Sequence, residues 1–153
     1  MDKKVIYLSG KVTGLDFDQT VAKFLQTERW LKYYGFAVIN PMKRIPVGTN
    51  WTQAMLICMD DVKRSDAVLL LHDWIDSDGA ALEKKCADWN KIPVFESMKA
   101  LRKTFERKSP FHRCHICGEN GYMSDMHIAL CTDCVDELNV FSLESGVRPT
   151  AWI

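Results

Sequence analysis

The chain has 153 residues, of which 47% are hydrophobic, and its formal net charge is zero. This length suffices for one domain with a small appendage, and zero net charge offers no general attraction to nucleic acid or to membrane surfaces. No apolar run approaches the length of a membrane span, so we expect a cytoplasmic protein. In that compartment the six cysteines stay reduced, and paired cysteines indicate metal binding more than disulfides.

The first part of the chain alternates short apolar strands with helical segments. The predicted elements, in chain order, are a strand at 5–8, a helix that starts at 17 and stops at 35, a strand at 36–39, a helix at 51–63, a strand at 67–71, a helix that ends near 89, a strand at 93–95 and a helix at 97–108. Asn50 is a candidate N-cap, and Asp66 is expected to have a structural role at the start of its strand. This alternation predicts an α/β fold with a doubly wound parallel sheet.

A different pattern begins after the Ser-Pro pair at 109–110, which we take as the boundary between an α/β domain at 1–108 and a small module at 109–153. Residues 110–153 contain two basic and six acidic side chains, which gives this part a net charge of −4. An acidic module without a stripe of lysine and arginine does not favour nucleic acid as a partner. We expect the module to contact protein or to support an oligomer.

Two CxxC pairs, separated by thirteen residues, lie in this module; their members are Cys114, Cys117, Cys131 and Cys134. Two knuckles joined by a short hairpin can place four thiolates tetrahedrally around one Zn²⁺, in a treble clef or a zinc ribbon. Four cysteines leave no open coordination position, so the metal would be structural and not catalytic. A module this short has little core, and zinc should supply much of its folding free energy.

One carboxylate follows the third predicted strand at a position that suits ligand binding. The strand at 67–71 leads into a turn of small residues and then into a helix that carries Glu83 in its first or second turn. In open α/β sheets, ligands bind beyond the carboxyl ends of the strands. A partly exposed carboxylate near a helix N-terminus stays ionised and can act as a nucleophile. The alternative is a surface glutamate in an ordinary helix.

Three segments are predicted to meet at one edge of the sheet, namely the residues after the first strand, the end of the helix at 51–63, and the stretch after the third strand. Their motifs resemble those of the nucleoside 2-deoxyribosyltransferase superfamily, in particular a short bacterial and phage subfamily that is similar to nucleoside 5′-monophosphate N-glycosidases. The resemblance covers roughly residues 3–100. The matching motifs are Tyr-Leu-Ser-Gly at 7–10, Asn-Pro at 40–41, Asp-Ala-Val at 66–68, and Trp74, Ser77, Gly79, Ala80 and Glu83.

The resemblance implies an enzyme that acts on an N-glycosidic bond. Glu83 would attack the anomeric carbon of the sugar, displace the base and form a covalent glycosyl-enzyme, which water or a second base then resolves by hydrolysis or transfer. Tyr7 would donate a hydrogen bond that orients this carboxylate, and its alternative role is packing at a strand end. Relatives complete their pockets with a neighbouring subunit, so a homo-oligomer is expected.

The resemblance also implies a (deoxy)nucleoside 5′-monophosphate as the substrate. Ser77 stands where transferases of free nucleosides carry an acid and where the 5′-monophosphate N-glycosidases carry a serine that contacts phosphate. A hydroxyl and the N–H groups at a helix start can bind a phosphate that a carboxylate would repel. Asp76 and Asp78 flank Ser77 and could bind a 5′-hydroxyl instead. The other candidate substrate-binding residues are Ser9, Gly10, Lys11, Trp74 and Gly79.

The group that would protonate the departing base is displaced from the family pattern. The family position falls near Cys58, and Asp61, one helical turn later, is our candidate for the role. Trp51 and Trp74 could stack on the base, or could pack in the core or in an interface. Cys58 and Cys86 are expected to be buried packing residues.

Two other functions are consistent with the same residues. A binding protein could sequester or sense a nucleotide in the same pocket without turnover, a reading favoured by the displaced base-handling acid. An adaptor could dock a partner through the zinc module and use the α/β domain as a scaffold. Removal of residues 110–153 separates this last function from the other two, because a nucleotide pocket in the α/β domain would survive it.

Purified protein should contain about one zinc ion per chain, bound by the two CxxC pairs. Cys114→Ser should release the metal and unfold the C-terminal module first, while most of the sheet stays folded. Elemental analysis of protein prepared without chelator measures the metal, and Cys86→Ser is the matched control that should keep it. Unsubstituted protein without metal would contradict the assignment.

Overall fold

The computed structural model describes residues 3–105, 122–123 and 129–130. The chain divides into two compact units, Met1–Phe105 and Glu106–Ile153. In the second unit the described residues form a short antiparallel pair, β5 (Tyr122–Met123) with β6 (Ala129–Leu130), between the two CxxC pairs in the sequence. The four cysteines predicted to bind zinc lie outside the described residues.

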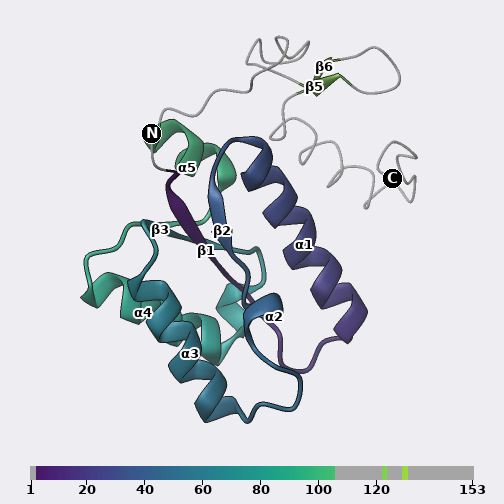
Figure 1. Cartoon of the computed structure of the whole chain (residues 1–153), viewed down its shortest axis with the longest axis vertical. Helices are drawn as coiled ribbons and strands as arrows, with labels where there is room; N and C mark the ends of the chain where they lie inside the picture. Colours follow the sequence, from purple (N-terminus) through teal and green to yellow (C-terminus); the bar gives the residue numbers. More distant parts are fainter. Residues whose placement is uncertain (1–2, 106–121, 124–128, 131–153) are drawn as a thin grey trace. The chain divides into compact units, whose positions relative to one another are not determined.

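The first unit contains a four-stranded sheet in which every neighbouring pair is parallel. Its strands are β1 (Val5–Ser9), β2 (Ala37–Ile39), β3 (Ala67–Leu70) and β4 (Val94–Phe95), in the spatial order β2-β1-β3-β4. Tyr7 in β1 lies opposite Ile39 on one side and Val68 on the other. The predicted α/β fold with a parallel sheet is confirmed, and β1 and β3 occupy the centre (Figure 1).

The helices begin where short polar side chains can cap them. The capped helices are α1 (Phe17–Tyr33), α2 (Pro41–Arg44), α3 (Trp51–Lys63), α4 (Asp78–Trp89) and α5 (Met98–Thr104), whereas the 3₁₀ turn η1 (Trp74–Asp76) has no side-chain cap. Asn50 accepts a hydrogen bond from the Gln53 N–H, as the sequence predicts, and α3 has the predicted bounds. The helix α2 and the turn η1 were not predicted, and α5 ends earlier than its predicted limit of residue 108.

Asp66 has the structural role expected of it. Its Oδ2 accepts a hydrogen bond of 2.7 Å from the Val5 N–H, the first residue of the neighbouring strand. The Asp66 N–H in turn donates to the Val5 carbonyl at 2.8 Å. This reciprocal pair fixes the start of β1 against the start of β3, and with it the register of the two central strands.

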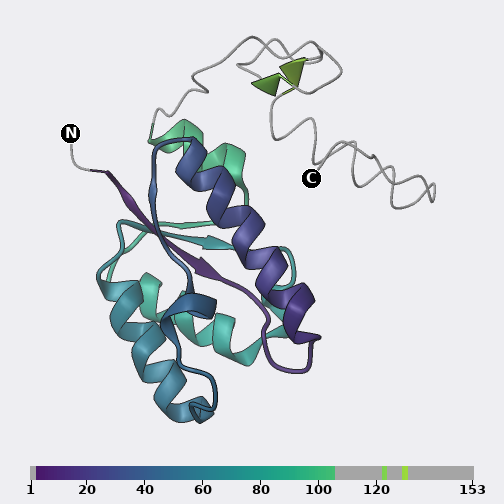
Figure 2. The ribbon, with the colours of Figure 1, turned by 45° about the vertical axis from the view of Figure 1, so that its right-hand side comes forward.

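The two faces of the sheet bury different side chains because alternate strand residues point in opposite directions. Ile6 and Leu8 pack with residues of α1 and α5, whereas Tyr7 packs with residues of α3 and α4. Figure 2 shows the sheet between these two layers of helices. Odd-numbered residues of β1 therefore face α4, and this determines which β1 side chains can reach Glu83.

The short helix α2 joins α1 to α3 through ion pairs. Glu28 of α1 is buried and accepts hydrogen bonds from Lys32 at 2.5 Å, Asn40 at 2.8 Å and Lys43 at 2.9 Å. Arg44, at the end of α2, pairs with Asp61 of α3. Figure 1 shows α2 just beyond the carboxyl end of β2, between α1 and α3 in this view.

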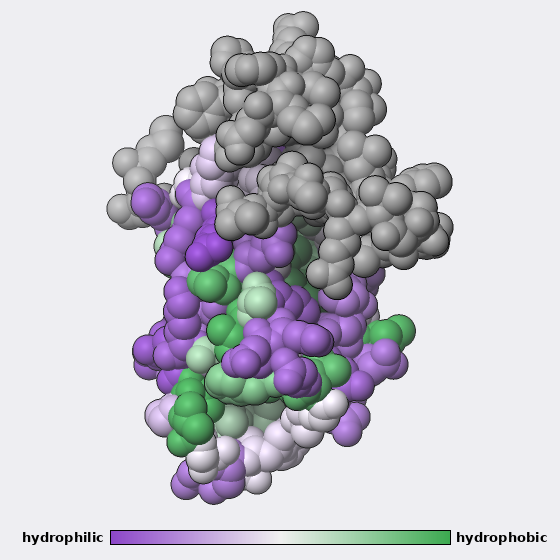
Figure 3. Space-filling view, turned by 90° about the vertical axis from the view of Figure 1, so that its right-hand side faces the viewer, coloured by the Kyte–Doolittle hydropathy of each residue, from purple (hydrophilic) through white to green (hydrophobic). Residues whose placement is uncertain are grey.

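The surface on the side of α1 is largely polar, with separate hydrophobic patches (Figure 3). Several large apolar side chains are exposed around the carboxyl edge of the sheet, including Phe17 at 59%, Trp51 at 51% and Ile75 at 75%. Within the described part of the chain, none of the helices has the length and apolar character needed to cross a membrane.

Glu28 should make folding stability depend on pH. Burial raises its pKa, but the hydrogen bonds from Lys32, Asn40 and Lys43 outweigh burial and lower the pKa to about 2. A lowered pKa stabilises the fold above the ordinary glutamate pKa of 4.5, and this stabilisation is lost as the pH falls toward 2.

Glu28→Gln should therefore cost about 1.5–3 kcal/mol at pH 7, the typical strength of a hydrogen bond to a charged group, and less near pH 3. Urea unfolding at several pH values measures this difference. Glu96→Gln, at an exposed glutamate, is the control and should change little at any pH. Equal costs for Glu28→Gln at pH 7 and pH 3 would contradict this role.

Candidate active site

Glu83 lies in the second turn of α4 and faces the sheet. Its side chain belongs to a buried stripe, with Ala80 and Ala87 one turn to either side, and only 6% of the residue is exposed. Its two carboxylate oxygens accept hydrogen bonds from two different hydroxyls. Tyr7 Oη donates to Oε1 at 2.9 Å, and Ser9 Oγ donates to Oε2. The predicted contact between Tyr7 and Glu83 is thus present.

The two hydroxyls reach the same carboxylate because they are two residues apart on one strand. Residues i and i+2 of a strand point to the same face, so Tyr7 and Ser9 both point from β1 toward α4. Both residues are completely buried. Ser9 was predicted to bind substrate, and the structure instead places its hydroxyl on Glu83.

The burial of Glu83 changes its electrostatics. Burial raises the pKa of Glu83, and the hydrogen bonds from Ser9, Tyr7 and Cys58 lower it only in part. Burial also raises the pKa of Tyr7, and the nearby negative charge of Glu83 raises it further, so the phenol keeps its proton and acts as a donor. The expectation that Glu83 is partly exposed was wrong. The second turn of α4 turns this residue toward the sheet and away from solvent.

Cys58 occupies the place where the resemblance implies an acid. It is 4% exposed on the buried face of α3, and it packs in the same cluster as Tyr7. Burial, with the charge of Glu83, raises the pKa of the Cys58 thiol to about 12. The thiol therefore stays neutral, and it is a far weaker proton donor than a carboxylic acid.

Asp61 has a different partner from the one predicted. Its Oδ1 and Oδ2 accept hydrogen bonds from Arg44 Nη2 at 2.9 Å and Nε at 3.1 Å. Both oxygens are therefore used in a two-point ion pair that ties α2 to α3. This pair orients the Asp61 carboxylate toward α2, whereas the predicted role requires it to face Glu83.

The loops after β1 and β3 are held in close contact beside Glu83. The Lys11 N–H donates to Asp73 Oδ1 at 3.0 Å, and Lys23 Nζ bonds both to Asp73 Oδ2 and to the Lys11 carbonyl. A Cβ atom at Gly10 would lie 3.0 Å from two side-chain atoms of Leu71, so any other residue here would force Leu71 to move. Gly10 and Lys11 thus lie at the predicted sheet edge, with the Lys11 amide bonded to Asp73.

The other predicted substrate residues lie at the start of α4. Ser77 is the N-cap, and its Oγ accepts a hydrogen bond from the Ala80 N–H at 3.2 Å. A Cβ atom at Gly79 would lie 3.3 Å from Met55 Sδ, so a side chain here would displace Met55. Trp74 is half-buried and packs against the cluster that contains Tyr7, whereas Trp51 is half-exposed at the start of α3.

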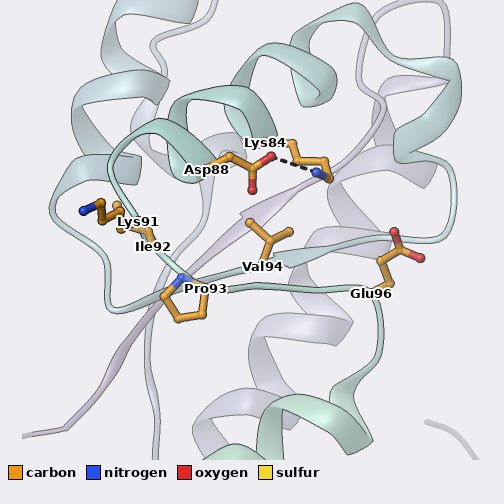
Figure 4. A pocket seen from close by; sticks show the side chains of 7 residues that line it. All are labelled: Lys84, Asp88, Lys91, Ile92, Pro93, Val94 and Glu96. Atoms are coloured by element: carbon orange, nitrogen blue, oxygen red, sulfur yellow. Dashed lines mark hydrogen bonds and ion pairs between the residues drawn. The ribbon is translucent and has the colours of Figure 1, made fainter.

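Two cavities in the described residues lie away from Glu83. One, of about 400 Å³, lies between α4 and the outer edge of β4 and contains the Lys84–Asp88 ion pair (Figure 4). The other, of about 370 Å³, is lined by both Glu28 and Asp61. Neither is lined by Tyr7, Ser9 or Glu83, so neither offers access to the buried carboxylate.

A family model described as a domain of unknown function, DUF4406, matches residues 4–96, which is more than half of the chain. The chain belongs to this family. The DUF4406 match contains Tyr7, Ser9, Cys58 and Glu83, and it ends before the first CxxC pair. No curated protein matches the sequence.

Two contacts of the candidate site were not predicted from the sequence, namely the hydrogen bond from Ser9 to Glu83 and the ion pair between Arg44 and Asp61. The strand alternation that places Tyr7 and Ser9 on one face was visible, and it could have assigned Ser9 to Glu83. The ion pair between Arg44 and Asp61 was not visible, since it depends on the four-residue helix α2.

Among the described residues, no group of three or more histidine, cysteine, aspartate or glutamate side chains is arranged to hold a metal ion.

Proposed function

We propose that this protein cleaves or exchanges the N-glycosidic bond of a (deoxy)nucleoside 5′-monophosphate, with Glu83 as the nucleophile. One observation carries this proposal. A glutamate at the carboxyl edge of a parallel sheet is buried, and each of its oxygens is held by a hydroxyl from β1. A carboxylate fixed in this way is positioned for attack and costs little reorganisation during reaction.

The reaction would run in two displacements. A Glu83 oxygen attacks C1′, the C1′–N bond breaks with its electron pair on the base nitrogen, and the base leaves with a proton taken from an acid or from water. Water then attacks C1′ and loses a proton, and the bond to Glu83 breaks to restore the carboxylate. The net change is nucleotide and water to free base and sugar phosphate. A second base in place of water gives transfer.

The start of α4 supports a 5′-phosphate on the substrate. Ser77 Oγ accepts from the Ala80 N–H, so its own hydroxyl hydrogen remains available to donate to a phosphate oxygen. The first N–H groups of α4 add the positive end of the helix dipole. Asp76 and Asp78 beside Ser77 act in the opposite direction, and this is why the phosphate preference needs its own test.

A second candidate is a protein that binds the nucleotide and does not cleave it. The neutral Cys58 thiol near Glu83 favours this candidate, because it supplies no acid for the departing base. The pair between Asp61 and Arg44 favours it for the same reason. Both candidates place the nucleotide at the same site, and turnover distinguishes them.

Glu83→Gln should abolish release of base from a nucleotide that the parent protein cleaves. The amide keeps the shape of the side chain but cannot attack C1′, so the rate should fall by about 10⁴-fold or more. Incubation with a panel of nucleoside 5′-monophosphates, read by chromatography of free base, measures this.

Glu96→Gln is the matched control for this change and should keep full activity, because Glu96 is exposed on the segment after β4. Full activity in Glu83→Gln would show that the nucleophile is elsewhere. A parent protein that binds nucleotides and releases no base would support the second candidate.

Ser77→Asp should shift preference from the 5′-monophosphate toward the free nucleoside. Aspartate caps a helix as well as serine does, so α4 should still form, but its charge repels phosphate. The ratio of kcat/KM for the two substrates measures the shift. Ser97→Asp is the control, since Ser97 caps α5 in the same way. An unchanged ratio in Ser77→Asp would remove Ser77 from the phosphate site.

A further inference from the structure

We propose that Ser9 is a positioning residue that holds Oε2 of the Glu83 carboxylate against β1, and that it does not bind substrate. This inference rests on the proposed role of Glu83 as the nucleophile. It replaces the prediction that Ser9 belongs to the substrate-binding set.

The geometry of Ser9 separates it from the substrate. The residue is completely buried at the end of β1. A serine hydroxyl has one hydrogen to donate, and that hydrogen points to Glu83 Oε2. While this bond exists, Ser9 cannot donate to a phosphate or to a sugar, so its effect on the reaction passes through Glu83.

Two hydroxyls fix the carboxylate where one would not. Tyr7 holds Oε1 and Ser9 holds Oε2, so rotation of the carboxylate about its terminal bond would break at least one of the two hydrogen bonds. Each oxygen keeps a further lone pair, because an ionised carboxylate has about four acceptor sites. The plane of the carboxylate is therefore set, and each oxygen keeps a lone pair with which it can attack.

The charged form of Glu83 is stabilised by uncharged hydrogen-bond donors. The groups that act on it from the described elements are neutral donors, namely Tyr7 and Ser9 on β1 and Cys58 on α3. A buried carboxylate without a cationic partner is costly to ionise. The hydrogen bond from Ser9 to Oε2 is one of the contacts that lower the pKa of Glu83 against the effect of burial, and it therefore favours the charged form.

The test compares the folding stability of Ser9→Ala with that of the parent chain at pH 5 and pH 8, by urea unfolding. Because the pKa of Glu83 is raised by folding, the parent loses stability as the pH rises from 4.5 through the raised pKa. Ser9→Ala should raise that pKa further. The difference between the urea midpoints of the parent and Ser9→Ala should therefore be larger at pH 8 than at pH 5.

A double-mutant cycle isolates the contact with the charge. In a Glu83→Gln background no carboxylate titrates, so the loss of midpoint caused by Ser9→Ala should be the same at both pH values. Ser65→Ala is the matched control, because Ser65 is also a buried serine but bonds to the Val62 carbonyl. The decrease in urea midpoint caused by Ser65→Ala should not depend on pH. If Ser9→Ala does not fold, Ser9→Cys, with a weaker donor, replaces it.

The pH dependence of base release is a second measurement, and a change in packing alone would not shift it. The acid limb of the pH profile of base release should shift upward by about one pH unit or more in Ser9→Ala, as expected for loss of a charge-assisted hydrogen bond. The value of kcat should fall while KM changes little. A larger change in KM would return Ser9 to the substrate-binding set and overturn the inference.

The stability measurements and the activity measurements together distinguish failure of this inference from failure of the proposed function. A loss of stability in Ser9→Ala that is equal at pH 5 and pH 8, or that keeps its pH dependence in the Glu83→Gln background, overturns the positioning role whatever the activity. A parent chain that releases no base, combined with the expected pH-dependent loss, rejects the enzyme and keeps the contact that holds Glu83 charged.

Discussion

A carboxylate buried without a cation beside it is stable only when its oxygens accept hydrogen bonds. Glu83 meets this condition through Tyr7 and Ser9, and the surrounding fold serves to keep these three residues together. The register of β1 places both hydroxyls on the α4 face, and the buried stripe of α4 directs Glu83 toward them. A shift of β1 by one residue would turn both hydroxyls to the α1 face.

The loops around this contact are constrained by their own interactions. Asp66 sets the start of β1 against β3, and Asp73 holds the two chain segments that follow those strands. Gly10 permits this approach because it has no Cβ to meet Leu71. Both ends of the β1–β3 pair are therefore fixed by separate contacts, and the Asp73 contact lies at the carboxyl edge that carries the candidate site.

The fold could be predicted because its signals are local. Alternating apolar strands and helices indicate the parallel sheet, and Asn50 marks the start of α3 directly. The burial of Glu83 could not be predicted, because alanines flank it one turn away on each side and give no strong apolar period. The role of Asp61 could not be predicted either, because it depends on Arg44 of α2. A helix of four residues is too short to show a periodic pattern in the sequence.

The proposed function requires the buried Glu83 carboxylate to form a covalent bond to the sugar during turnover. The most direct measurement is peptide mass spectrometry of protein that is quenched in acid while it reacts with a nucleotide bearing a 2-fluoro sugar, which slows the second displacement. A glycosyl adduct on the peptide that contains Glu83 is the expected result. Release of base with the adduct on a different residue, or with no adduct at any quench time, would show that Glu83 is not the nucleophile.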